Sequence, residues 1–112
     1  MNLSEFEQRV FDVALASSIC SIPTLHRLTS SSVNLRMDVL SGGFVEAFFN
    51  ERTGTTAFAW IRDRQRVFGA DNTGGWHVHP FAAPEQHIPL RGAMSFAEFV
   101  AEIERHEGQV TV

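Results

Sequence analysis

Residues 33–71, VNLRMDVLSGGFVEAFFNERTGTTAFAWIRDRQRVFGAD, decide the fold of this 112-residue chain. Over residues 33–39, apolar and polar side chains alternate, which is the pattern of a strand that is buried on one face. Short turn sequences separate this segment from three further segments rich in β-branched and aromatic residues, 44–50, 55–61 and 66–71. Four strands joined by such short turns predict an antiparallel meander.

A helix is predicted on each side of the meander. Residues 4 to about 19 begin with Ser-Glu-Phe-Glu, a capping box, and continue with apolar side chains at helical spacing. Residues 95–98, Ser-Phe-Ala-Glu, form a second capping box at the start of a helix that we expect to end near Arg105. An amphipathic helix must cover an apolar sheet face, so the sequence predicts one α+β domain over residues 1–112, with the C-terminal helix packed on the sheet.

The composition excludes several kinds of chemistry. Arginine supplies all nine basic residues, and there is no lysine or tyrosine. Schiff-base catalysis, a phosphate-binding loop with its lysine, and a phenolic acid or nucleophile are therefore excluded. With one cysteine, the chain can form neither an internal disulfide nor a multi-thiolate zinc site, which favours a cytoplasmic protein. No apolar run approaches the roughly 20 residues that cross a bilayer, so we expect no membrane partner.

The candidate functional segment is the irregular stretch of residues 71–90, which carries three of the five histidines. If residues 77–79 are extended, the imidazoles of His77 and His79 point to the same side, and His87 can fold back towards them. Such a cluster can bind a metal such as zinc through neutral imidazoles, with Asp71 or Glu85 as a carboxylate partner. It can also perform acid–base chemistry near neutral pH, or hold a rigid loop by hydrogen bonds.

One local pattern in this segment resembles part of a metalloprotease motif. Residues 75–80, Gly-Trp-His-Val-His-Pro, are similar to the Gly-Trp-x-His-x-His-Pro run of the JAMM family, in which two histidines and a downstream aspartate hold zinc. That family continues with Ser-x-x-Asp. Ile88 and Arg91 stand at the corresponding positions here, so the motif is incomplete.

A second resemblance spans about residues 33–105. Residues 66–72, Arg-Val-Phe-Gly-Ala-Asp-Asn, followed by a histidine-rich loop and a phenylalanine-rich C-terminal helix, resemble the TumE family of toxin–antitoxin proteins. The family commonly has Asp-His-x-x-His where this chain has residues 85–87, Glu-Gln-His. The resemblance implies a small toxin that acts on RNA or its machinery, with an antitoxin protein as partner.

A metal-independent ribonuclease of this kind needs a base, an acid and a cation that meets the phosphate. His79 and His87 are the candidate acid and base, and Asp71 would orient one imidazole. Arg66 or Arg91 would face the phosphate. The further candidate binding residues are Asn72, Trp76 and His77.

Two of these candidates also have ordinary structural interpretations, and a non-catalytic role for the chain stays open. Asn72 is well placed to bond the backbone in the turn after a strand, and Trp76 can stack on a base or fill the core beneath the loop. The chain can equally be a protein-interaction module that forms a homodimer through an exposed sheet edge.

Overall fold

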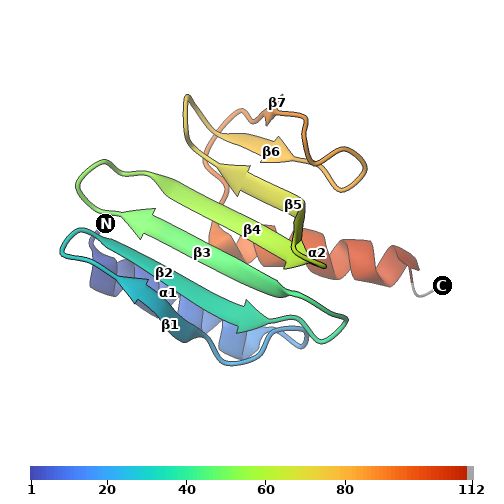
Figure 1. Cartoon of the computed structure of the whole chain (residues 1–112), viewed down its shortest axis with the longest axis horizontal. Helices are drawn as coiled ribbons and strands as arrows, with labels where there is room; N and C mark the ends of the chain where they lie inside the picture. The colour runs from blue at the N-terminus through green and yellow to red at the C-terminus, as the bar shows by residue number, and fades with distance from the viewer. Residues whose placement is uncertain (111–112) are drawn as a thin grey trace.

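The computed structural model describes residues 1–110, which form seven strands and two helices (Figure 1). The predicted domain extends to residues 111 and 112, which lie outside the described residues. In chain order the elements are α1 (Leu3–Ala16), β1 (Thr24–Leu28), β2 (Ser32–Asp38), β3 (Phe44–Asn50), β4 (Thr56–Arg62), β5 (Gln65–Asp71), β6 (His77–His79), β7 (Ile88–Pro89) and α2 (Phe96–Val110).

All seven strands form one antiparallel sheet whose spatial order is the sequence order, β1 to β7. The predicted meander is therefore confirmed, but the predicted number of four strands is wrong. All five side chains of β1 are exposed, so it has no alternation of buried and exposed residues to detect. With three and two residues, β6 and β7 are too short for a periodic signal. The edges of the sheet are β1 and β7, and the homodimer through such an edge stays a prediction.

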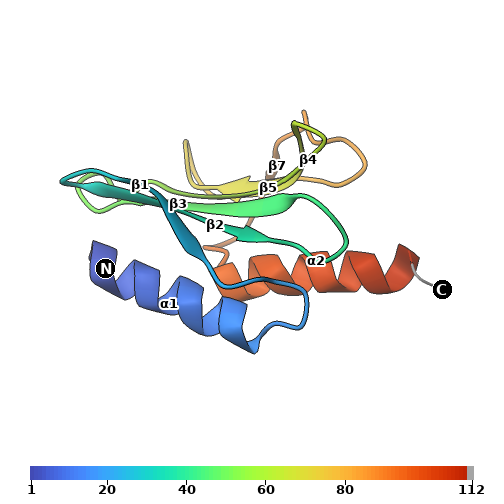
Figure 2. The same ribbon diagram turned by 60° about the horizontal axis from the view of Figure 1, so that its bottom comes forward.

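Both helices lie on one side of the sheet, while β7 and the loop before it rise on the other side (Figure 2). The capping box predicted at Ser4 is wrong, because Asn2 caps α1 and accepts a hydrogen bond from the Glu5 N–H. The capping box of α2 is confirmed by reciprocal hydrogen bonds between Ser95 and Glu98. Helix α1 ends at Ala16 rather than near residue 19, and α2 continues to Val110 instead of ending near Arg105. Neither helix is long and apolar enough to span a bilayer.

The hydrophobic core fills the space between the helices and the inner face of the sheet. Alternate residues of β2, β3 and β4 are buried, as the sequence pattern predicted for a strand covered on one face. Phe58 packs its ring against those of Phe6, Phe96 and Phe99, so the aromatic side chains join both helices to the sheet. The largest fully buried side chains are Trp60, Phe99, Leu35, Met37 and Ile103.

The outer face of the sheet carries the candidate functional residues. Cross-strand pairing aligns Ala59 of β4 with Gly69 of β5, and Gly69 with His79 of β6. The next row on this face aligns Asp71 with His77. Because neighbouring residues of a strand point to opposite faces, burial of Ala70 in the core directs Asp71 and both histidines away from the helices.

Candidate functional site

The functional side chains meet where β5 ends and β6 begins. Asp71 is the last residue of β5, and His77 and His79 are the first and last residues of β6. The residues between the strands form a turn in which Gly74 and Gly75 both adopt positive φ angles. The prediction that His77 and His79 share one side of an extended segment is confirmed, since both imidazoles contact the same carboxylate.

Asp71 links the two imidazoles of β6. Its Oδ1 lies 3.3 Å from Nε2 of His77, and its Oδ2 lies 3.1 Å from Nε2 of His79. The backbone N–H of Thr73 donates to Oδ1 over 3.0 Å. Burial by itself raises the pKa of Asp71, but the bond from Thr73, the bond to His79 and the charges of both histidines outweigh it and lower the pKa below its ordinary value. Asp71 is therefore ionised at neutral pH.

The opposite nitrogen of each imidazole faces a backbone carbonyl. Nδ1 of His77 lies 2.9 Å from the carbonyl oxygen of Gly75, and Nδ1 of His79 lies 3.1 Å from that of Gln86. A carbonyl oxygen only accepts hydrogen bonds, so each contact requires a hydrogen on Nδ1. Each ring then directs Nε2 towards Asp71.

Arg66 gives Nδ1 of His79 a second possible hydrogen-bond partner besides the Gln86 carbonyl. Its Nη2 lies 3.2 Å from Nδ1 of His79 and also donates to the carbonyl oxygen of Pro84 over 3.1 Å. With hydrogen on Nδ1, His79 donates to Gln86 and Arg66 keeps its bond to Pro84. With hydrogen on Nε2, His79 instead accepts from Arg66 and donates to Asp71. The site thus provides partners for both tautomers of a ring that is only 2% exposed.

His87 completes a cluster of three imidazoles. Antiparallel pairing of Val78 with Ile88 folds β7 back along β6 and places His87 beside the other two rings. The ring centroid of His87 lies 4.8 Å from that of His77 and 4.4 Å from that of His79. The centroids of His77 and His79 lie 4.9 Å apart. One nitrogen from each ring falls within 4.8 Å of the other two. His87 is exposed, and its ring takes part in no hydrogen bond with the side chains that the structure describes.

Gly69 makes room for this cluster. A Cβ atom at this position would lie 2.9 Å from Cδ of Arg66 and 3.4 Å from Cδ2 of His79. Arg66 therefore passes directly over the backbone of Gly69 to reach Pro84. Sequence analysis assigned Gly69 no role, although a glycine inside a strand is typical of a site where another group approaches the backbone closely.

Phe81 anchors the loop between β6 and β7. Its ring stacks on that of Phe68 with centroids 4.1 Å apart and on that of His106 of α2 with centroids 4.0 Å apart. The start of the loop is thus held by the core, while Pro84 and Gln86 are held by Arg66 and His79 on the outer face. No local sequence pattern marks Phe81, because its stacking partners lie on distant elements.

The remaining predicted residues lie outside the cluster. The side-chain amide of Asn72 forms two hydrogen bonds with backbone groups near the start of β4. Its Oδ1 accepts from the Thr56 N–H and its Nδ2 donates to the Gly54 carbonyl, each over 2.9 Å. Trp76 packs on the helix side of the sheet, with its ring centroid 6.3 Å from that of Phe58. Within residues 1–110, no hydrogen bond or ion pair joins the side chain of Arg91 or Glu85 to the histidines. The structure brings together Arg66, Asp71, His77, His79 and His87.

The three imidazoles of this cluster lie close enough together that they could hold a metal ion. Ligand atoms about 2.0–2.1 Å from a tetrahedral zinc ion are about 3.3 Å from one another. The 3.3 Å separation of Oδ1 of Asp71 from Nε2 of His77 and the 3.1 Å separation of Oδ2 from Nε2 of His79 are close to that value. The imidazole nitrogens of the three histidines lie within 4.8 Å of one another and would have to move closer to bind one ion. Nδ1 hydrogen bonds to backbone carbonyls are also typical of histidines that bind metal through Nε2.

Comparison of the chain with family models, curated proteins and solved structures finds no match. The fold and the site together define a two-layer α+β protein with a cluster of three histidines and an aspartate on the open face of its sheet.

Proposed function

We propose that this protein binds a divalent transition-metal ion, zinc in the first place, through His77, His79, His87 and Asp71. One observation carries the proposal. The Nε2 atoms of two imidazoles converge on one carboxylate, while backbone carbonyls lie at their Nδ1 atoms. Nitrogen-rich ligand sets of this kind suit zinc and its neighbours in the transition series.

Electrostatics support a cation at this position. With hydrogens on both Nδ1 atoms, the Nε2 lone pairs of His77 and His79 face the ionised carboxylate of Asp71. In these tautomers the acceptors repel one another, and a cation between them would remove the repulsion. A hydrogen on Nε2 of His79 removes the repulsion at that ring only in the tautomer in which Nδ1 accepts from Arg66, and that tautomer loses the bond to the Gln86 carbonyl. A metal ion supplies the cation and leaves the imidazoles neutral.

With Asp71 as a fourth ligand beside the three histidines, the site would have a closed coordination sphere. A closed tetrahedral sphere is typical of metal sites that stabilise structure, whereas catalytic sites keep one position for water or substrate. The ion would tie the exposed His87 to β6 and so fix the loop that precedes β7. We therefore propose metal-dependent ordering of this loop, without a catalytic step.

The toxin and ribonuclease hypotheses stay predictions. His79, Asp71, Arg66 and His87 lie close enough to act together, but a side chain that is 2% exposed, such as His79, is poorly placed to exchange a proton with RNA. A separate experiment tests this function: expression should arrest growth, and His87→Ala should relieve the arrest. The antitoxin partner likewise stays a prediction.

Isothermal titration of metal-free protein with zinc tests the metal site. We expect one zinc ion per chain for the wild type and a loss of at least about tenfold in affinity for His77→Ala and for His87→Ala. His87→Ala should keep the thermal stability of the metal-free wild type, because the His87 side chain is exposed. His26→Ala is the matched control, since His26 is an exposed histidine on the opposite edge strand, β1. Binding that is equally strong in wild type and His87→Ala would contradict the proposal.

A further inference from the structure

A second candidate site lies on the other face of the sheet. A cavity of about 560 Å³ opens between α1 and the N-terminal end of α2. Cavities of about 300–1,000 Å³ are typical of small-molecule binding sites. This cavity shares no residue with the histidine cluster, so it is independent of the proposed metal site.

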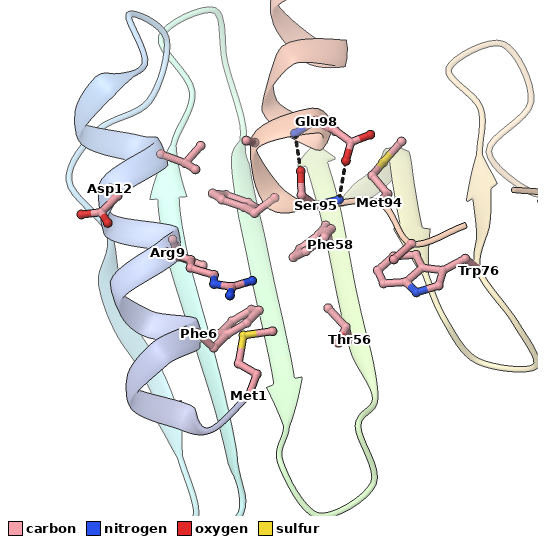
Figure 3. A pocket seen from close by; sticks show the side chains of 15 residues that line it. Met1, Phe6, Arg9, Asp12, Thr56, Phe58, Trp76, Met94, Ser95 and Glu98 are labelled. Atoms are coloured by element: carbon pink, nitrogen blue, oxygen red, sulfur yellow. Dashed lines mark hydrogen bonds between the residues drawn. The ribbon is translucent and has the colours of Figure 1, made fainter. Parts of the chain in front are cut away.

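The lining of the cavity is predominantly apolar. Phe6 of α1 contributes one wall, Phe58 of β4 contributes to the floor, and Trp76 and Met94 lie on the far side (Figure 3). Val10 of α1 also lines the cavity. Trp76 and Met94 are only partly buried against the core, so both retain surface that a ligand can cover. Such a lining favours a ligand with an apolar body.

Arg9 is the charged group directed into the cavity. Figure 3 shows its guanidinium reaching in from α1, whereas the carboxylate of Asp12 points away. Among the side chains that the structure describes, Arg9 has no partner in a hydrogen bond or ion pair. Glu98 and Ser95 are already bonded to each other in the capping box. Asp12 accepts a hydrogen bond from Gln8, so Arg9 is the one charged side chain of the lining without a partner among the described residues.

We propose that the cavity binds an amphipathic monocarboxylate, a small molecule with an apolar body and one carboxylate group. The apolar body would lie between Phe6, Phe58 and Trp76, and the carboxylate would accept two parallel hydrogen bonds from the guanidinium of Arg9. Arginine binds carboxylates in this bidentate way, and such charge-assisted bonds are stronger than neutral ones. Charge complementarity at Arg9 selects the anionic head group over a neutral or cationic one.

Titration with decanoate, followed by tryptophan fluorescence, tests this proposal. We expect saturable binding at one molecule per chain and an emission change that is lost in Trp76→Phe. The other tryptophan, Trp60, is 1% exposed and does not line the cavity, so its emission supplies a constant background. Decanol and decyltrimethylammonium have the same apolar chain without the negative charge, and both should bind more weakly than decanoate.

Variants then separate the contribution of the carboxylate head group to binding from the contribution of the apolar cavity. Arg9→Gln should weaken decanoate binding about tenfold or more and leave decanol binding unchanged, because a charge-assisted hydrogen bond is lost. Ala97→Phe should fill the cavity and abolish binding of both ligands, because Ala97 lines it. Ala101→Phe is the matched control, since Ala101 is an exposed alanine of the same helix that does not line the cavity.

Three results would overturn the proposal. Equal affinity for decanoate and decanol, or no effect of Arg9→Gln on decanoate binding, would show that the cavity does not recognise the carboxylate group. Decanoate binding that survives Ala97→Phe would place the ligand elsewhere. An absence of saturation up to the solubility limit of decanoate would exclude the site altogether. Decanoate binding should be unchanged in His87→Ala, so neither proposal depends on the other.

Discussion

Replacing Gly69 by alanine is expected to loosen the histidine cluster while the fold stays intact. The new Cβ atom would stand 2.9 Å from Cδ of Arg66, and ordinary van der Waals contact begins at 3.4 Å. Arg66 must therefore retreat by about 0.5 Å, the difference between these distances, whereas Cδ2 of His79 at 3.4 Å only comes into ordinary contact. The bond from Arg66 to Pro84 is already 3.1 Å long, so this retreat is enough to break it.

Two effects on the free energy of unfolding nearly offset each other. Loss of the bond from the exposed Arg66 costs about 1 kcal/mol. Alanine lowers the conformational entropy of the unfolded chain relative to glycine, and this raises the free energy of unfolding by about 0.5–1 kcal/mol. The melting temperature should therefore change by no more than about 4–8 °C. Zinc affinity should fall by about tenfold or more, because the loop that precedes His87 loses its bond from Arg66.

Calorimetric zinc titration and thermal unfolding of Gly69→Ala measure both quantities. Hydrogen exchange of residues 80–88 in metal-free protein adds a readout that does not depend on zinc, and exchange should be faster in the variant. Gly92→Ala is the matched control, since no atom lies within 4 Å of a Cβ at that position. Unchanged zinc affinity together with unchanged exchange would refute the packing argument. An equal loss in Gly92→Ala would show that the effect does not arise at the histidine cluster.

Three further predictions concern other parts of the chain. Asn72→Ala should lower the free energy of unfolding by about 1–3 kcal/mol in denaturant titrations and leave zinc affinity unchanged, because its amide satisfies two backbone groups. Phe81→Ala should cost about 2 kcal/mol, less than the ~3–5 kcal/mol of a fully buried phenylalanine, and weaken zinc binding as well, since the loop loses its anchor on Phe68. Burial raises the pKa of the Cys20 thiol, and the Glu104 carboxylate adds a smaller increase. A hydrogen bond with Ser17 lowers this pKa, but the net effect is an increase above the ordinary value. Iodoacetamide should therefore alkylate Cys20 more slowly in folded protein than in urea at pH 8. The neutral thiol stabilises the fold fully below the unfolded pKa of about 8.5, and this contribution is lost as the pH rises through the higher folded value.

Local sequence patterns predicted the elements that carry a strong periodic signal. The bounds of β3 were predicted exactly as residues 44–50, and β2, β4 and β5 were predicted to within one residue at each end. The capping box of α2 was predicted, whereas that of α1 was placed two residues too late, because Asn2 competes with Ser4 for the cap. Strands β1, β6 and β7 gave no periodic signal, since their side chains are exposed or their lengths are too short.

By itself, the sequence determined the meander, the two covering helices and the stretch of residues 66–91 in which acid–base or metal chemistry was to be sought. These depend on spacings of a few residues, which the order of amino acids fixes directly. Only the tertiary structure decided which candidates meet. It joined Asp71 to His77 and His79, brought His87 back through the pairing of β7 with β6, and placed Trp76 on the opposite face. These contacts depend on strand pairing and on the space above Gly69, which arise only when distant segments pack together.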